Sequence, residues 1–113
     1  MLKIEKIDEI LHIKFNNTNR FNALIAEPVK EKLKSFFEGD GVKLILDLEG
    51  VKFIDSTGFG VFLSILKTAN STSGTFRICN VTDEVMELFK LLQLQNVFDI
   101  YPNLDSCVAT FKE

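Results

Sequence analysis

The 113-residue sequence is poor in residue types on which catalysis and metal binding often depend. It contains one histidine and two cysteines. Cys79 and Cys107 sit in apolar patterns, without a C-x-x-C spacing and without a histidine nearby. This pattern predicts two buried thiols in a cytoplasmic protein, with a disulfide as the alternative, and it gives no reason to expect a metal or a cofactor.

Positive charge and long hydrophobic runs are also lacking. The formal net charge is −3, and no stripe of lysine and arginine runs along the chain. The charge argues against a general nucleic-acid binder and against a protein that binds anionic membranes. No segment approaches the length of a membrane span, and residues 1–6 alternate apolar and charged types instead of forming the apolar core of a signal peptide. The sequence therefore predicts a cytoplasmic location without direct membrane insertion.

What the sequence has is enough apolar residue for one folded domain. With 46% hydrophobic residues over 113 positions, we expect a single domain spanning residues 1–113 around one core, filled mostly by the eleven phenylalanines. Residues 2–7 and 10–15 alternate with the period of half-buried strands, and Asp8-Glu9 between them fits a hairpin. Residues 16–20 are expected to form a polar loop. Further strands are expected at 42–48, 75–79 and 97–101.

Helical periodicity separates these strands. A stripe formed by Ala26, Val29, Leu33, Phe36 and Phe37 predicts a helix that ends near residues 39–41, and residues 57–70 predict another. A third helix is expected after the N-cap Thr82, and a fourth at 104–111. The third is expected to bury Val85, Leu88, Phe89 and Leu92. Together these patterns predict an α/β domain with a mixed, mostly parallel sheet, an N-terminal β-hairpin and about four α-helices.

The most informative stretch is residues 45–60, where a buried strand passes through Asp55-Ser56-Thr57-Gly58 into a helix. Ser56 is placed at a helix N-terminus, where free backbone N–H groups favour negative charge, so it is a natural seat for a phosphoserine. Sites in such folds favour the carboxyl ends of strands. The alternative is an ordinary connection in which Asp or Ser caps the helix and Gly relieves crowding.

Enzymatic alternatives fit the sequence less well. A nucleophilic serine needs a histidine, but the single one, His12, lies on the predicted hairpin, and no G-x-S-x-G motif surrounds Ser56. The glycines do not have the spacing of a phosphate-binding P-loop. A phosphoaspartate at Asp47 or Asp55 lacks the acidic pair expected after a first strand. We therefore expect a protein that is not an enzyme.

The helix predicted at 57–70 carries apolar residues around more than half of its circumference, whereas a surface helix needs an arc of roughly 100°. We therefore expect Phe59 and Leu63 to be exposed beside Ser56 and to face a partner. The alternative is that both pack under neighbouring loops.

The sequence resembles the STAS domain family, specifically bacterial anti-sigma factor antagonists. The resemblance rests on Leu44-Ile45-Leu46-Asp47-Leu48, Val51 and Phe53 to Val61, on Phe21-Asn22-Ala23 with the helix that follows, and on the segment from Val85 to Ala109. It covers nearly the whole chain. One departure is Asn22, because many antagonists carry an aspartate at this position.

The resemblance implies a partner-switching regulator. Unphosphorylated members bind an anti-sigma factor that is also a serine kinase and so release the sigma factor; phosphorylation blocks binding, and a PP2C-type phosphatase restores it. Ser56 is then the phosphoacceptor, and Asp55, Thr57 and Gly58 shape its loop. We expect the partner-binding residues to be Asn22, Phe59, Gly60 and Leu63. The alternative is a STAS subunit of a membrane lipid-transport complex that is not phosphorylated.

Overall fold

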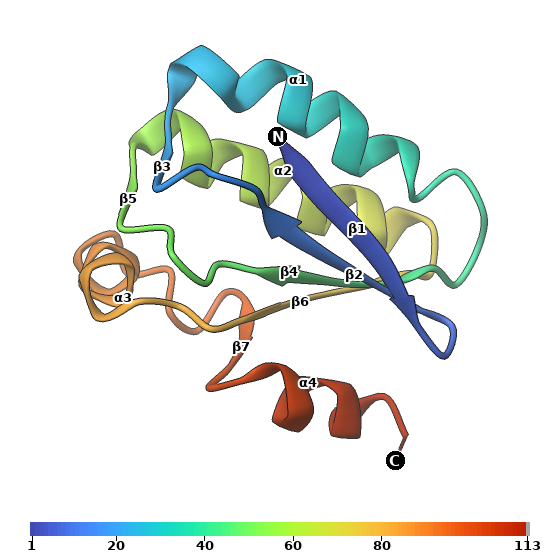
Figure 1. The fold of residues 1–113 in the computed structure, drawn as a ribbon. Helices are drawn as coiled ribbons and strands as arrows, with labels where there is room; N and C mark the ends of the chain where they lie inside the picture. Colours follow the sequence, from blue (N-terminus) through green and yellow to red (C-terminus); the bar gives the residue numbers. More distant parts are fainter. Residues whose placement is uncertain (113) are drawn as a thin grey trace.

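A computed structural model of the chain describes residues 1–112 and is built around a five-stranded mixed sheet (Figure 1). The strands are β1 (Leu2–Ile7), β2 (Ile10–Phe15), β4 (Lys43–Asp47), β6 (Thr75–Cys79) and β7 (Asp99–Tyr101), and they lie in the order β1-β2-β4-β6-β7. β1 and β2 are antiparallel, and every other neighbouring pair is parallel. The predicted hairpin and mostly parallel sheet are confirmed.

The β1–β2 hairpin turns through Asp8 and Glu9, where Asp8 adopts a positive φ of 56°. Ile7 lies opposite Ile10 at the turn, and Leu2 lies opposite Phe15 at the far end. Beyond the strands, the Asn16 amide donates to the Met1 carbonyl at 2.7 Å. β1 has a paired strand on one side only, so it forms an edge of the sheet.

A second, two-stranded ladder joins β3 (Arg20–Phe21) to β5 (Phe53–Ile54) in parallel, with Phe21 opposite Ile54. The sequence predicts a polar loop that includes Arg20, and this expectation is wrong at its last residue. A strand of two residues is too short to produce a readable alternation, because each face receives a single side chain.

Four helices complete the fold of residues 1–112: α1 (Ala23–Ser35), α2 (Ser56–Ser71), α3 (Asp83–Leu91) and α4 (Leu104–Thr110). In Figure 1, α1 and α2 lie above the sheet and α4 lies below it. The split follows the side-chain alternation of β4, because Leu44 and Leu46 join the main core while Ile45 packs with Cys79 and Cys107 of the smaller cluster. The expected core is thus divided between the two faces of the sheet.

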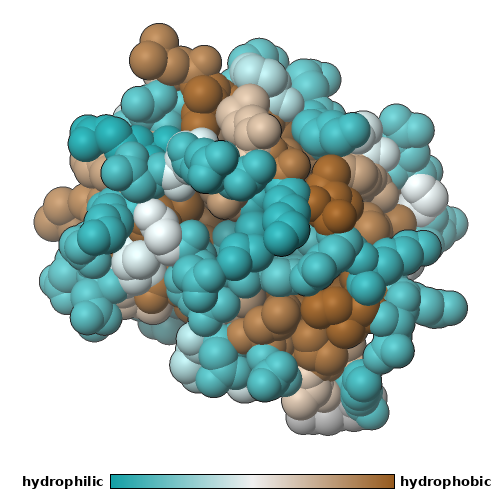
Figure 2. Space-filling model, in the orientation of Figure 1, coloured by the Kyte–Doolittle hydropathy of each residue, from teal (hydrophilic) through white to brown (hydrophobic). Residues whose placement is uncertain are grey.

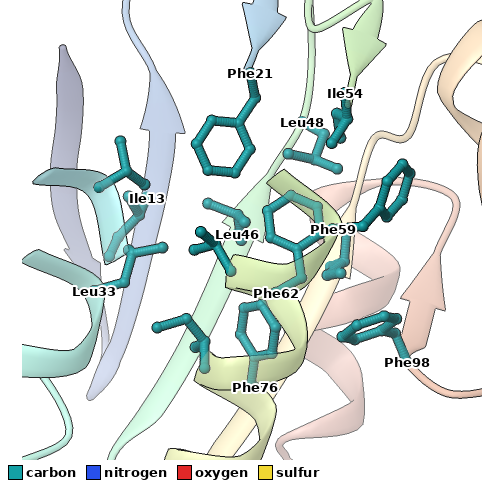
Figure 3. Close-up of a cluster of buried hydrophobic side chains, with 14 of the residues drawn as sticks. Ile13, Phe21, Leu33, Leu46, Leu48, Ile54, Phe59, Phe62, Phe76 and Phe98 are labelled. Atoms are coloured by element: carbon teal, nitrogen blue, oxygen red, sulfur yellow. The ribbon is translucent and has the colours of Figure 1, made fainter. Parts of the chain in front are cut away.

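Phenylalanine rings fill the main core, as predicted from their number (Figure 3). Phe62 of α2 lies near the middle: its ring centroid is 5.5 Å from that of Phe21 and 6.3 Å from that of Phe98. Phe59 meets Phe89 of α3 edge to face, at 4.9 Å between centroids. Such pairs add to the stabilisation that comes from burying the rings, and they tie α2 to α3.

Two residues near the ends of elements lie elsewhere than predicted. Leu92, expected in the buried stripe of the third helix, is exposed, because α3 ends at Leu91 and Leu92 is its C-cap. Val97, expected in the last strand, is also exposed, because β7 begins only at Asp99. Helix and strand ends are set by local hydrogen bonds that periodicity does not report.

Candidate functional site

Two helices begin side by side at one end of the molecule. β3 leads into α1 through Asn22, and β5 leads into α2 through Asp55. Because β3 and β5 are paired in parallel, the residues that follow them are neighbours, and the Asp55 amide donates to the Phe21 carbonyl at 3.2 Å. The structure thus places Asn22 next to the loop that carries Ser56.

The Asp55 carboxylate serves both helices. Its Oδ1 accepts from the Gly58 amide at 2.9 Å and caps α2, while its Oδ2 accepts from the Ala23 amide at 3.1 Å at the start of α1. The Asn22 side chain caps α1 by accepting from the Leu24 amide at 3.0 Å. Amides that would otherwise be unpaired at both helix starts are therefore satisfied, and the connection is held by backbone contacts.

Ser56 and Thr57 are the first two residues of α2, and both are exposed. Within residues 1–112 the Ser56 hydroxyl takes part in no hydrogen bond to another residue. The cap of α2 is Asp55, one of the two residues expected to cap the helix, and Ser56 does not serve as the cap. The hydroxyl is left available at the positive end of the helix dipole, where an anion is favoured.

Gly58 holds the loop close to the core. A Cβ at this position would lie 2.7 Å from Ile54 Cγ2 and 3.0 Å from the Phe21 carbonyl oxygen. A methyl group therefore does not fit unless β3, β5 or the helix start moves. Glycine is needed here because of this close approach.

The outward face of α2 carries Ser56, Gly60 and Leu63, whose positions follow one another at helical spacing and are all exposed. Leu63 is 41% exposed. Phe59 does not belong to this face: it is 3% exposed and packs against Phe89, so its predicted exposure is wrong. The wide apolar arc of α2 arises because Phe59 and Phe62 pack against Phe89 of α3, while other residues of the helix face the sheet and α1.

Leu24 is a surface residue that sequence reasoning missed. It is 88% exposed and lies in the first turn of α1, two residues after Asn22. The available signal was its place outside the buried stripe of Ala26, Val29 and Leu33. A leucine on the polar side of an amphipathic helix is not needed for the core.

A separate polar cluster links neighbouring strands of the sheet, from β1 through β2 and β4 to the residue after β6. The buried His12 ring contacts Asp47 Oδ2 through Nε2 at 2.8 Å and Glu5 Oε1 through Nδ1 at 2.5 Å. Asp47 is buried too, and it accepts from the Asn80 amide group and from the Glu49 backbone amide. Both ring nitrogens of His12 therefore have partners other than Ser56.

The two aspartates considered as phosphoacceptors are also engaged. Asp47 is enclosed by its hydrogen-bond partners, and Asp55 uses both carboxylate oxygens to accept from backbone amides. Across residues 1–112, no three His, Cys, Asp or Glu side chains gather in a way that could hold a metal ion.

The two thiols are buried and free, which confirms the cysteine prediction. Burial raises the pKa of Cys107 to about 11 and that of Cys79 further still. Both groups therefore remain protonated at neutral pH, a state in which thiols are poor nucleophiles and metal ligands. No helix among the described residues is long and apolar enough to cross a membrane.

The sheet order and the paired strands that lead into two neighbouring helices define a class of α/β domain. A family model described as "STAS domain" matches residues 1–107, so the chain belongs to the STAS domain family. A relative from Bacillus subtilis (strain 168), named anti-sigma-B factor antagonist, is 30% identical over 88 residues that cover 78% of this chain and 80% of the relative.

Solved structures agree on the fold. An anti-sigma-factor antagonist (STAS) domain protein from Planctomyces limnophilus matches with a TM-score of 0.90 and 18% identity, covering 99% of this chain and 98% of that one. The anti-sigma factor antagonist SpoIIAA, solved in its unphosphorylated form, matches with a TM-score of 0.70 and 14% identity over 97% and 96% of the two chains. These likenesses confirm the predicted STAS-like architecture.

Proposed function

We propose that the chain is a partner-switching regulator that binds an anti-sigma factor while Ser56 is unphosphorylated and releases it once Ser56 carries a phosphate. The observation that carries this proposal is the free, exposed hydroxyl of Ser56 at the start of α2, beside the fixed carboxylate of Asp55. The relative named anti-sigma-B factor antagonist and the solved antagonist with an unphosphorylated form support it.

The same location explains why a phosphate leaves the fold intact and yet disturbs binding. At neutral pH a phosphoryl group adds roughly −1.5 to −2 charges and three acceptor oxygens. Within the domain, the N-termini of α1 and α2 lie close by and favour an anion. Toward a partner, the added charge stands next to Asp55, and covering two negative groups with a second protein carries a large desolvation cost.

The surface around Ser56 has the features of a binding patch. Leu63 lies two helical turns along α2, Leu24 lies at the start of the neighbouring helix, and Gly60 between Ser56 and Leu63 leaves open space above the backbone. Apolar anchors surrounded by polar residues are typical of protein interfaces. We infer that this patch receives the anti-sigma factor, with Asn22 and Thr57 at its polar rim.

The proposed cycle also needs an enzyme for each direction. A serine-kinase activity of the anti-sigma factor transfers the γ-phosphoryl group of ATP to Ser56 Oγ and releases ADP and the hydroxyl proton. A PP2C-type phosphatase hydrolyses the phosphoserine and restores the free hydroxyl. In this cycle the chain is the substrate and supplies no catalytic group, and it acts in the cytoplasm.

Phosphopeptide mapping tests the acceptor assignment. The chain is incubated with the serine-kinase anti-sigma factor of the same organism and ATP, and the modified peptide is sequenced by mass spectrometry. We expect modification at Ser56, its loss in Ser56→Ala, and its retention in the matched control Thr57→Ala. Modification confined to Thr57 or to another element would contradict the assignment.

Binding assays test the switch itself. Ser56→Ala should bind the anti-sigma factor like the unmodified chain, whereas phosphorylated chain should bind at least about tenfold more weakly, a change of about 1.4 kcal/mol. Equal affinity of both forms would contradict the proposal. Capture of a transporter ATPase by the unmodified chain, without any anti-sigma factor, would favour the lipid-transport alternative.

A further inference from the structure

The free edge of the central sheet is unusually open. β1 forms this edge (Figure 1). Its residues Lys3, Ile4, Glu5 and Lys6 are all exposed. Ile4 is 41% exposed although it lies opposite the fully buried Ile13. An edge strand presents unpaired backbone groups that can pair with another strand.

The hairpin register decides which backbone groups of β1 face outward. Antiparallel pairs alternate between hydrogen-bonded and non-bonded types. Because the Asn16 amide bonds the Met1 carbonyl, position 1 faces β2, and by alternation positions 3, 5 and 7 do so as well. The N–H and C=O groups of Leu2, Ile4 and Lys6 therefore point away from the sheet.

We propose that two copies of this chain associate through β1, antiparallel and edge to edge, with Ile4 of each copy on the two-fold axis. In this arrangement Ile4 exchanges both backbone hydrogen bonds with Ile4 of the second copy, and Leu2 pairs with Lys6 in the same way. The two five-stranded sheets become one sheet of about ten strands, the usual outcome of edge pairing.

Charge selects this register over its neighbours. Outward-facing groups occur only at even positions, so the neighbouring symmetric registers place either Lys3 against Lys3 or Glu5 against Glu5 on the axis. In the proposed register Lys3 instead lies directly opposite Glu5 of the second copy, twice by symmetry. Non-bonded pairs bring side chains closest together, so opposite charges are favoured there and like charges are disfavoured.

The two faces of the pairing are consistent with this register. On the face of the main core, the exposed parts of the two Ile4 side chains cover each other, and Leu2 lies against the aliphatic stem of Lys6. On the other face, Glu5 already contacts His12, and Lys3 has no ion-pair partner within residues 1–112. Lys3 of the second copy thus meets a carboxylate that the fold holds in place.

Sedimentation of charge variants tests the pairing. The full chain should show a reversible monomer–dimer equilibrium, because a contact of one strand per copy is small for a protein interface. Lys3→Glu creates two Glu–Glu pairs and should weaken dimerisation about tenfold or more. Lys6→Glu, which makes the same change of net charge opposite Leu2, is the matched control and should leave the dimer nearly unchanged.

A mixing experiment gives the sharper outcome. Lys3→Glu and Glu5→Lys should each dimerise poorly alone, yet their equimolar mixture should form heterodimers, since every facing pair is then Glu against Lys. Circular dichroism shows whether each variant is folded. If Glu5→Lys is not folded, Lys3→Arg takes its place as a reference variant that should still dimerise.

Hydrogen exchange locates the interface independently of any variant. The Ile4 amide should be protected at high protein concentration and exchange freely on dilution, while the Lys3 amide, bonded to β2, stays protected in both. A chain that remains monomeric up to about 1 mM, a dimer that Lys3→Glu leaves intact, or an Ile4 amide that is insensitive to dilution would overturn the proposal. None of these results depends on phosphorylation of Ser56.

Discussion

Gly58 is the position in the site at which an added side chain is tolerated least. Gly58→Ala should destabilise the chain by about 1–3 kcal/mol, because the added methyl group meets Ile54 and the backbone of Phe21 at or below 3.0 Å. Gly60→Ala is the matched control in the same helix: nothing lies within 4 Å of its added Cβ, and it should stabilise by about 0.5–1 kcal/mol.

Urea denaturation of the two alanine variants measures both changes. The opposite signs are the point of the comparison, since both substitutions are identical in chemistry and differ by two positions. Equal effects of the two variants would mean that the close approach at Gly58 is not what sets its identity.

Asn22 caps α1 beside Asp55, which lies at the start of the neighbouring helix. Asn22→Asp keeps an oxygen that can cap α1, so stability and unphosphorylated binding should change little. It adds a second carboxylate next to Asp55, so the initial rate of Ser56 phosphorylation should change. Asn103→Asp, at the N-cap of α4, is the control with the same chemistry elsewhere. An unchanged rate in Asn22→Asp would remove this residue from the kinase-facing surface.

At the scale of elements, α2 shows where periodicity succeeds and where it stops. The pattern predicts the helix and its apolar excess, and it identifies Leu63 as a surface residue. It cannot say whether Phe59 faces solvent or another helix, because that depends on α3, which arrives from residues far along the chain. Periodicity also fails to predict two-residue strands such as β3, because such strands are recognised by their pairing with another strand and not by their own sequence.

Leu63→Ser and Phe59→Ala should therefore separate binding from stability. Leu63→Ser should weaken binding of the anti-sigma factor by about 1–3 kcal/mol while the fold is retained. Phe59→Ala should instead lower the free energy of unfolding by about 3–5 kcal/mol, because it leaves a cavity between α2 and α3. Titration calorimetry and denaturation of both variants check this. A folded Leu63→Ser with unchanged affinity would remove Leu63 from the interface.

At the scale of the whole molecule, the order of strands and helices could be predicted because each element carries its own pattern. The pairing of His12 with Asp47 could not, since these residues are 35 positions apart and meet only when β2 lies beside β4. Asp47 gave a faint signal as a charged residue within an apolar run. Its buried partners, including Asn80, were visible only in the fold.

The smaller cluster, in which Cys107 of α4 packs against the sheet, predicts how the stability of the domain responds to alkali. Cys107 has an ordinary pKa of 9.0 and a folded pKa of about 11, so the unfolded chain loses its thiol proton first. Its contribution to stability is complete below pH 9 and is lost as the pH rises through about 11. The Cys79 pKa is raised in the same direction.

The free energy of unfolding, measured by denaturation between pH 8 and pH 11, should therefore fall. Glu49 raises the pKa of Lys14 by hydrogen bonding, and this acts in the same direction, so a variant without thiols is needed as a reference. Cys79→Ala/Cys107→Ala should show a shallower decline. Identical slopes in the two proteins would contradict a role for the thiols.

The double use of Asp55 has a consequence for timing. Because both of its oxygens hold helix amides, the carboxylate cannot turn away from a phosphate on Ser56 without releasing two helix starts at once. In the proposed switch, phosphorylation then changes the charge of this surface while the backbone keeps its conformation. Dephosphorylation therefore requires no rearrangement of the chain. The rate at which the binding-competent form returns should therefore equal the rate of dephosphorylation by the phosphatase. The inactive state of the domain then lasts only as long as the phosphate ester.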